Sequence, residues 1–414
     1  MAHLVRRPVP DHVPSGLVRE FDFFTDPNFL ADPWVAFDAL ADAPEIFWSP
    51  VGGQGYHGGG GYWFIHGYDA VREGFRRHDL FGASFGPGET SMPEAAECPA
   101  GVPLTVDPPD HARYRALLAE DFTPRAAAML ESKLRTLAAD LIDSFAQRGS
   151  CEFVEEFGRP FPAAAFLALF GLPSAEWKRF VELAATILHP GGKAAAAAAA
   201  QEEINVILAD LIASRQKDPR DDLMSHVLQR PFGDQPSPPR AVAESIAHLL
   251  FEAGLDTMTM ALGHFFLFLA TNPAHRQRLR DDPGVTANAV EELLRANSFI
   301  TLPRFVKEDT TFRGVFMKKG DHVWLPTACG SRDPHSWERH DEVNFDRLAH
   351  RHLIFGAGPH RCLGSHLARL ELRVAIEEFN TRIPEYSVAA NYVPDYHGGI
   401  GMGLDSLRLV WDTQ

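Results

Sequence analysis

The sequence predicts a mainly α-helical protein with minor β-structure, and three features of its 414 residues support this fold class. Residues 124–228 follow a mainly helical pattern, which includes the alanine run at 194–200. A further long helix is predicted at about 241–271. Proline and glycine cluster near 51–61 and 81–109, so the N-terminal part is expected to form short irregular or strand segments.

The chain is long for one domain, although a large enzyme can bury one continuous core around a cofactor. No repeat period is visible, and no linker is long enough to separate independent domains. We therefore predict a single domain over residues 1–414. It is expected to have a mixed α/β portion at about 1–110 and a helix-rich portion at about 111–414.

The composition is that of an ordinary globular protein, with 45% hydrophobic and 23% charged residues. The 30 phenylalanines against 7 tyrosines and 7 tryptophans indicate a need for purely apolar rings, such as the lining of an apolar site. The formal net charge of -16 argues against nucleic acid or an anionic membrane as the main partner, because both attract basic surfaces.

The cysteines indicate a reducing compartment and no cysteine-rich metal site. None belongs to a CxxC pair, so neither a zinc knuckle nor an iron–sulfur cluster is encoded. The four are Cys98, Cys151, Cys329 and Cys362. At the N-terminus, arginines and prolines stand where a signal peptide or membrane anchor needs an unbroken apolar run. We therefore expect a cytoplasmic protein without a membrane partner.

The helix expected at 241–271 is flanked by Pro239 and Pro273, and apolar residues occupy every face of its second half. Such a helix belongs inside a protein. A membrane span is the alternative, but ionisable side chains interrupt the apolar stretch. They are Glu244, His248, Glu252, Asp256 and His264.

Within this helix lies the stretch Ala-Gly-Leu-Asp-Thr at 253–257. Gly254 lowers helix propensity and Thr257 can bond to a carbonyl one turn back, which together permit a local opening. Asp256 and Thr257 beside such an opening could pass protons. The alternative is a glycine used for close packing, with the acid and the alcohol solvated.

A second motif reads Phe-Gly-Ala-Gly-Pro-His-Arg-Cys-Leu-Gly at 355–364, and a helical pattern follows it directly. Cys362 therefore lies on a glycine-rich loop just before a helix. Backbone N–H groups and the positive end of the helix would stabilise a thiolate there and moderate its donation to a metal. In isolation, an incidental loop cysteine is the alternative.

The stretch 355–364 resembles the haem-binding signature of the cytochromes P-450, with Phe355, Gly356, the ligand Cys362 and the following Gly364 in the family's places. The resemblance implies the family's single triangular haem-thiolate fold, haem b as cofactor and Cys362 as the iron ligand. It places haem binding in the helix-rich portion of the chain.

The resemblance extends to Glu292 and Arg295, which lie three residues apart and match the family's buried ExxR ion pair. Arg347 matches the arginine that completes their network. An ExxR pair by itself is usually a surface salt bridge of little energy. Here the pair precedes Arg347 and Cys362 in the chain, in the order that the family shows, and this order supports the resemblance.

The resemblance also covers Asp256 and Thr257, which match the family's oxygen-activating pair, and 107–115, which resembles the segment before its third helix. Haem propionates need charged or polar donors. The resemblance assigns this role to His111, Arg115, Arg304 and His360. Histidines near the loop could instead suggest zinc, but no ligand-spaced pair on one helical face emerges.

The bacterial camphor-hydroxylase group is especially similar, through His-Val-Pro at 12–14 and Leu-Val-Trp-Asp at 409–412. Members that bind camphor use a tyrosine shortly before the Asp-Pro-Pro segment, and this chain has none between Tyr68 and Tyr114. We therefore expect a compact cyclic terpenoid-like substrate other than camphor. Candidate contacts are Phe85, Phe251, Gly254, Leu255 and Ile300.

The implied activity is a monooxygenase that uses dioxygen and receives electrons from an external [2Fe-2S] ferredoxin with its reductase, since the chain has no flavin or cluster motif. A monomer is expected. Two alternatives stay open: a haem-thiolate enzyme that uses peroxide or rearranges its substrate, and a haem protein that only senses ligands. Asp256 and Thr257 favour stepwise protonation of dioxygen, and no effector segment for a sensor is visible.

Overall fold

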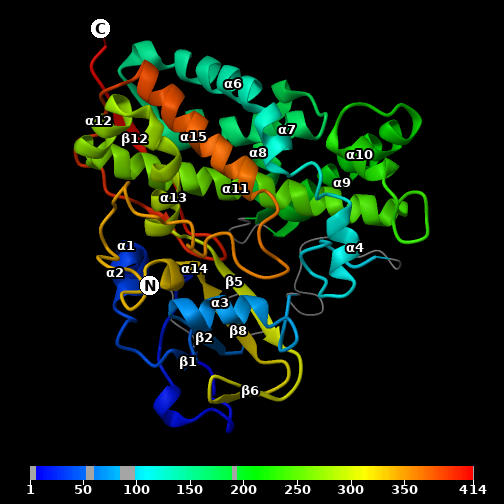
Figure 1. Cartoon of the computed structure of the whole chain (residues 1–414), viewed down its shortest axis with the longest axis vertical. Helices are drawn as coiled ribbons and strands as arrows, with labels where there is room; N and C mark the ends of the chain where they lie inside the picture. The colour runs from blue at the N-terminus through cyan, green and yellow to red at the C-terminus, as the bar shows by residue number, and fades with distance from the viewer. Residues whose placement is uncertain (1–5, 53–59, 84–97, 189–193, 414) are drawn as a thin grey trace. The chain divides into compact units, whose positions relative to one another are not determined.

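The computed structural model describes residues 6–52, 60–83, 98–188 and 194–413 (Figure 1). The chain forms two compact units, which we call the sheet unit and the helical unit. The sheet unit comprises Met1–Glu89, Gly284–Cys362 and Val393–Asp405, and the helical unit comprises Thr90–Pro283, Leu363–Tyr392 and Ser406–Gln414.

The sheet unit is built on a five-stranded sheet with the order β1-β2-β8-β5-β3. The pair β2–β8 is parallel, and the other neighbouring pairs are antiparallel. Aromatic and β-branched residues, which favour strands, make up β1 and β2 except for Ser49, and all of their side chains are buried. The strands are β1 (Ile46–Ser49), β2 (Tyr62–Ile65), β3 (Phe81–Gly82), β5 (Thr301–Val306) and β8 (His322–Pro326).

Helix α3 (Tyr68–Arg76) packs on this sheet (Figure 1). Gly74 permits the close approach, because a β-carbon at this position would lie 2.8 Å from the Leu325 side chain on β8. The remaining α-helices and strands of the sheet unit are α1 (Pro27–Ala31), α2 (Pro33–Asp38), α13 (Thr286–Ala296), α14 (Thr327–Ser331) and the strand pairs β6–β7 (Thr310–Phe312, Val315–Met317) and β10–β11 (Tyr396–His397, Gly403–Leu404).

The helical unit contains most of the helices, together with a small antiparallel sheet of order β4-β12-β9. Its helices are α4 (His111–Ala116), α5 (Pro124–Met129), α6 (Glu131–Asp143), α7 (Pro160–Leu169), α8 (Trp177–Leu188), α9 (Ala194–Lys217), α10 (Leu223–Gln229), α11 (Arg240–Thr271), α12 (Pro273–Asp281) and α15 (Ser365–Arg382). Its strands are β4 (Ser150–Glu152), β9 (Ser387–Val388) and β12 (Arg408–Val410). The predicted fold class, mainly α with minor β, is confirmed.

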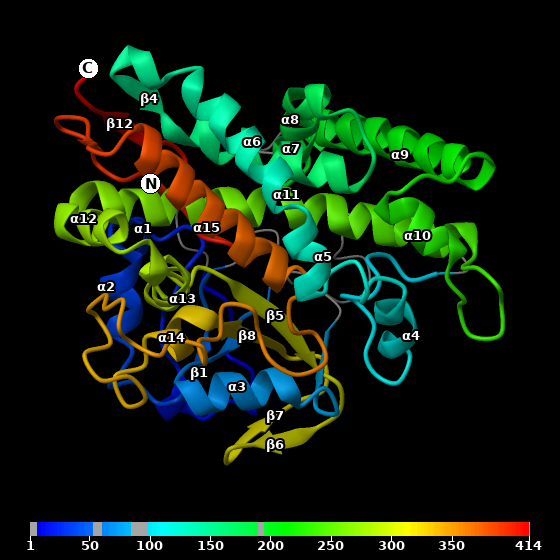
Figure 2. The same cartoon turned by 45° about the horizontal axis from the view of Figure 1, so that its top comes forward.

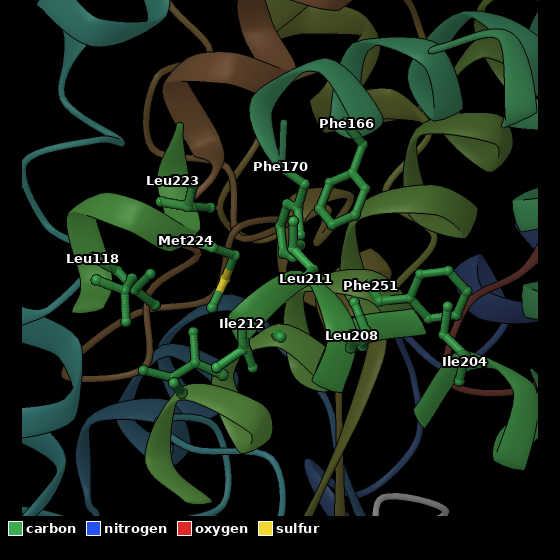
Figure 3. Packing of buried hydrophobic residues seen from close by; sticks show 14 of the residues in the cluster. Leu118, Phe166, Phe170, Ile204, Leu208, Leu211, Ile212, Leu223, Met224 and Phe251 are labelled. Atoms are coloured by element: carbon green, nitrogen blue, oxygen red, sulfur yellow. The ribbon is translucent and has the colours of Figure 1, made fainter. Parts of the chain in front are cut away.

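Helix α11 begins after Pro239 and ends at Thr271, within one residue of the predicted bounds. Phe251 from this helix lies in a core cluster with side chains from α7, α9 and α10 (Figure 3). Among the described residues, α11 has the length and composition of a membrane span, and 67% of its most apolar window is buried inside the protein. The burial explains the apolar composition, because this window is part of a core.

Ion pairs fasten α15 to α6, which lies alongside it (Figure 2). Arg135 on α6 donates to Glu378 at 2.7 Å, and Arg373 on α15 donates to Glu131 at 2.8 Å. Helix α15 is the helix that follows the cysteine loop in the chain, so these contacts fix the element that continues from the loop.

Many phenylalanines pack on one another in the two cores. Phe47 and Phe64 stack at 5.3 Å in the sheet unit, and Phe153 and Phe266 stack at 4.3 Å in the helical unit. Such aromatic contacts add to the energy of burial. Phenylalanine thus contributes to the cores of both units.

Candidate functional site

The cysteine loop of the sheet unit is held by backbone hydrogen bonds within 353–362. The Cys362 N–H donates to the Phe355 carbonyl at 2.8 Å, and the Gly356 N–H donates to the Leu353 carbonyl at 2.7 Å. Gly356 and Gly358 have φ values of 65° and 74°, which side chains disfavour. A β-carbon on Gly358 would also lie 2.9 Å from the carbonyl oxygen of Phe75, so the loop requires a glycine here.

Cys362 differs from the other three cysteines in its exposure. Its thiol is exposed, whereas Cys98, Cys151 and Cys329 are buried. Burial raises the pKa of each of these three thiols, which makes them poor thiolate ligands. In the chain, Gly364 follows Cys362 and caps α15, an 18-residue helix. Cys362 is therefore the cysteine suited to bind a metal through its sulfur.

A buried ion-pair network lies in the sheet unit, at the residues for which the resemblance to the cytochromes P-450 implies one. Arg295 donates to both carboxylate oxygens of Glu292, at 2.8 and 3.0 Å, and both side chains are 0% exposed. Arg347 donates to Glu292 at 3.0 Å. The N–H of Asn344 donates to the same oxygen at 2.9 Å.

The two arginines of this network also bind the surrounding backbone. Arg295 donates to the carbonyls of Ser331, His340 and Glu342 at 2.8 to 3.1 Å. Arg347 donates to the carbonyls of Glu338 and Arg339. The network thus ties α13 to the long segment that leads toward the cysteine loop, and it satisfies the buried charges.

The predicted propionate donors are divided between the two units. Arg304 lies on β5, is 4% exposed, donates to the Pro303 carbonyl at 2.7 Å and lies over the Phe75 ring. His360 belongs to the cysteine loop of the same unit. His111 and Arg115 lie four residues apart on α4 of the helical unit, so they share one helical face.

Helix α11 runs without a break through 253–257, so the predicted local opening is not present. The glycine is used for packing, because a β-carbon on Gly254 would lie 2.7 Å from the ring of Phe166. The Thr257 hydroxyl donates to the carbonyl of Ala253 at 3.0 Å, one turn back. Asp256 and Thr257 are only half-buried, in contrast to Leu255 and Met258 beside them.

Other proposed substrate residues have different environments. Phe251 lies 6.1 Å from Phe180, and it belongs with Leu255 to the core of the helical unit. In the sheet unit, Ile300 is paired with Gly401 in an isolated β-bridge, so the backbone around Ile300 lies beside the backbone around Gly401. Phe85 lies outside the described residues.

The sequence profile of the family described as Cytochrome P450 matches residues 284–381, which include the Glu292 network and Cys362. The probable cytochrome P450 127A1 of Sinorhizobium fredii is 33% identical over 410 residues, and the match covers 98% of this chain and 97% of that protein. The chain belongs to the cytochrome P450 family.

Solved structures agree with this assignment. The crystal structure of the cytochrome P450 CYP101C1 has a TM-score of 0.87 at 30% identity, over 98% of this chain and 100% of that chain. The structure of CYP101J2 has a TM-score of 0.85 at 28% identity, over 98% and 99% of the two chains. These likenesses confirm the cytochrome P450 fold and the predicted resemblance to the bacterial camphor-hydroxylase group. The protein is thus a cytochrome P450 monooxygenase, an oxidoreductase.

The cofactor of the cytochrome P450 family is haem b, and the residues of this chain fit it. Cys362 offers an exposed sulfur on a loop whose glycines are required by its backbone, as a thiolate ligand needs. Arg304 offers a buried guanidinium that suits a carboxylate. No group of three or more histidine, cysteine or acidic side chains that could hold a metal ion occurs among the described residues.

Sequence reasoning missed Glu371 on α15, a residue with a carboxyl group that is only 4% exposed. Burial raises the pKa of Glu371 from 4.5 to about 8, and its Oε2 atom has no hydrogen-bond partner within the described ranges. The sequence pattern of α15 gave no sign that Glu371 is buried, because a single acid in an amphipathic helix normally faces water.

Glu371 is expected to make stability depend on pH. Because its folded-state pKa is raised, the native state holds a proton that the unfolded chain releases above about pH 4.5, so stability falls as pH rises toward about 8. Glu371→Gln removes this loss, which is on the order of a few kcal/mol. The melting temperature of this variant relative to the wild type should therefore rise between pH 5 and 8 and level off above.

The control for this experiment is Glu202→Gln, which changes an exposed carboxyl group on α9. Its melting temperature should differ from that of the wild type by the same small amount at every pH. If the melting temperature of Glu371→Gln differed from that of the wild type by a constant amount between pH 5 and 8, the Glu371 side chain would not be buried in its neutral form.

Proposed function

We propose that this cytochrome P450 hydroxylates a small apolar, cyclic terpenoid-like substrate in the cytoplasm, with dioxygen and electrons from a [2Fe-2S] ferredoxin and its reductase. The observation that carries the haem-thiolate assignment is the exposed Cys362 on a glycine-shaped loop, in the same unit as the buried Glu292 network. The likeness to two CYP101 structures supports the substrate class.

We propose further that the chain works as a monomer and that its two units are parts of one cytochrome P450 domain over residues 1–414. The match to CYP101C1 over 98% of this chain and 100% of that chain supports one functional domain. The net charge of -16 supports a role without nucleic acid or membrane as partner.

Each group of candidate residues has a role toward the cofactor. When bound, haem b supplies the activation of dioxygen for the insertion of one oxygen atom into a C–H bond. The Cys362 sulfur would hold the iron, and Phe355, Gly356 and Gly364 would shape the loop around it. The propionates would be held by His111, Arg115, Arg304 and His360.

Asp256 and Thr257 are proposed to deliver protons. A carboxylate can accept a proton from water and pass it on, and an alcohol can donate one hydrogen bond while it accepts another. The Thr257 hydroxyl donates to Ala253, which leaves its lone pairs available to accept a proton donor. For substrate contact we propose Ile300, Phe251, Gly254 and Leu255, together with Phe85 outside the described residues.

The assignment is tested by the absorption spectrum of the purified protein, reduced and exposed to carbon monoxide. A red-shifted Soret band typical of thiolate ligation is expected. Titration of the ferric protein with borneol, 1,8-cineole, limonene and β-ionone should then shift the spin state for at least one of them. A histidine-type spectrum from folded protein would overturn the haem-thiolate assignment, and no response to any terpenoid would overturn the substrate class.

Thr257→Ala is expected to uncouple NADH oxidation from product formation. Without the hydroxyl, protons reach the site less selectively, so product formed per NADH should fall about tenfold and hydrogen peroxide should appear. Both are measured in a reconstituted system with ferredoxin and reductase.

Thr271→Ala is the matched control, because Thr271 also donates to a carbonyl one turn back in α11, at 2.8 Å from Leu267. Thr271 lies at the exposed end of the helix. The product yield of Thr271→Ala should therefore equal that of the wild type. An unchanged yield for Thr257→Ala without peroxide would contradict the proposed proton role.

A further inference from the structure

The ionisable residues in the first half of α11 recur at every fourth position. Residues four apart on a helix are neighbours on its surface, with about 5–6 Å between their β-carbons. The row consists of Arg240, Glu244, His248, Glu252 and Asp256. The residues between them are apolar or small, so this row is a continuous polar ridge on an otherwise apolar helix.

The two ends of the ridge carry different residues. Arg240 donates to Glu244 at 2.7 Å, and their side chains are 51% and 33% exposed, so this end meets solvent. The other end is Asp256, which is half-buried and directly precedes Thr257. The proposed proton donors therefore lie at the opposite end of the row from the Arg240–Glu244 ion pair, with the buried His248 between them.

His248 occupies the middle of the ridge and is 4% exposed. Its Nδ1 atom is buried and has no hydrogen-bond partner in the part of the chain that the structure describes. Buried polar atoms in proteins are nearly always paired, and ordered water supplies the partner where protein atoms do not. The geometry at His248 thus points to a water molecule on the ridge.

His248 also has the electrostatic setting of a proton carrier. Burial lowers the pKa of His248, and the charge of Glu244, one turn away on the same helix, is the influence that raises it among the described residues. Its imidazole is therefore neutral near pH 7, and a neutral imidazole can accept a proton at one nitrogen and release one from the other.

Side-chain direction in a helix connects the members of the row. Each Cα–Cβ bond tilts toward the N-terminus, so the Glu252 side chain leans back over the turn of His248, and the Asp256 side chain leans toward Glu252. Glu252 and Asp256 are half-buried, and Ala253 between them is exposed. A single water can bridge groups at this spacing.

We propose that His248 and Glu252 form a water-bridged proton path along α11 that carries protons from the Arg240–Glu244 end to Asp256. Each transfer breaks one O–H or N–H bond and forms one on the next acceptor, and reprotonation from solvent restores each group. The net change is one proton taken from solvent and one delivered at Asp256. This inference rests on the proposed monooxygenase function.

The first test is a titration of His248 that needs no turnover. Histidine labelled at ¹³Cε1 is observed by NMR in the ferrous carbon-monoxide form of the holoprotein, and His248→Leu identifies the signal by its loss. Glu252→Gln removes a carboxylate that is coupled to His248 through water, so it should lower the His248 pKa. Glu252→Asp should restore it, and Glu202→Gln, an exposed change on α9, should leave it unchanged.

The second test uses turnover with the terpenoid that binds most tightly in the spin-state titration. His248→Leu and Glu252→Gln should each lower the rate of product formation about tenfold and raise the solvent deuterium isotope effect, because a proton transfer becomes limiting. The terpenoid dissociation constant should stay at the wild-type value, and Glu252→Asp should recover most of the rate.

Two outcomes would overturn the proton path. One is a wild-type His248 pKa in Glu252→Gln together with a wild-type isotope effect. The other is a change in the terpenoid dissociation constant without a change in isotope effect, which would make Glu252 a substrate contact. Both leave the thiolate spectrum intact, whereas failure of the proposed function would appear as loss of that spectrum in the wild type itself.

Discussion

Glu292→Ala is expected to lower the free energy of unfolding by about 3–5 kcal/mol, because it leaves the guanidinium of Arg295 buried without its carboxylate. Arg295 is 0% exposed, and Arg347 loses the same partner. Native domains are stable by only about 5–15 kcal/mol, so most of the protein should fail to accumulate in folded, haem-loaded form. The measurements are soluble yield, haem content and melting temperature.

The chain offers a matched control for this experiment. Arg339 and Glu342 form an ion pair with the same three-residue spacing, at 3.1 Å, but their side chains are 58% and 54% exposed. Glu342→Ala should cost about 0–1 kcal/mol, as exposed pairs do. Exposed ion pairs change the melting temperature by roughly 2 °C or less. If the melting temperature of Glu292→Ala lay within about 2 °C of that of Glu342→Ala, the buried network would not be what stabilises the sheet unit.

Cys362→Ser is expected to abolish the red-shifted Soret band of the reduced carbon-monoxide complex, together with product formation. A serine hydroxyl is far less acidic than a thiol and cannot supply the same electron donation to iron. The loop itself should persist, because its bonds at Cys362 and Gly356 are made by backbone atoms. Far-UV circular dichroism and haem content check that the protein is folded.

Cys98→Ala is the control for the cysteine experiment, because Cys98 is buried and belongs to the core of the helical unit. It should keep the thiolate spectrum, with at most a modest loss of stability. A retained red-shifted band in Cys362→Ser would show that another cysteine binds the iron.

The turns of the cysteine loop and the shared helical face of Glu292 and Arg295 could be predicted from the sequence because their geometry is set over short distances. The burial of this pair and its contact with Arg347, 55 residues from Glu292, were implied only by the resemblance to the cytochromes P-450. Gly356 and Gly358 supply backbone angles that other residues avoid, and a three-residue spacing places Glu292 and Arg295 on one helical face. The bounds of α11 were also predictable, since prolines at both ends stop a helix. These features depend on neighbours in the chain.

Partners that are distant in the sequence could not be predicted in this way. The carbonyls of Ser331 and His340 complete the coordination of Arg295, and the ring of Phe166 explains why Gly254 has no side chain. From the sequence alone, Gly254 was interpreted as permitting a local opening of the helix. The structure shows an unbroken helix, because close packing against α7 uses the missing β-carbon instead.

The sequence by itself determined the family and the cofactor, and it predicted Cys362 as the ligand, because the spacing and turn residues of the motif can be recognised locally. Only the tertiary structure decided which ionisable groups are buried. The burial of His248 and Glu371 depends on helices that pack on α11 and α15 from other parts of the chain. The physical reason is that solvation is set by the whole surrounding core, whereas backbone geometry is set by a few adjacent residues.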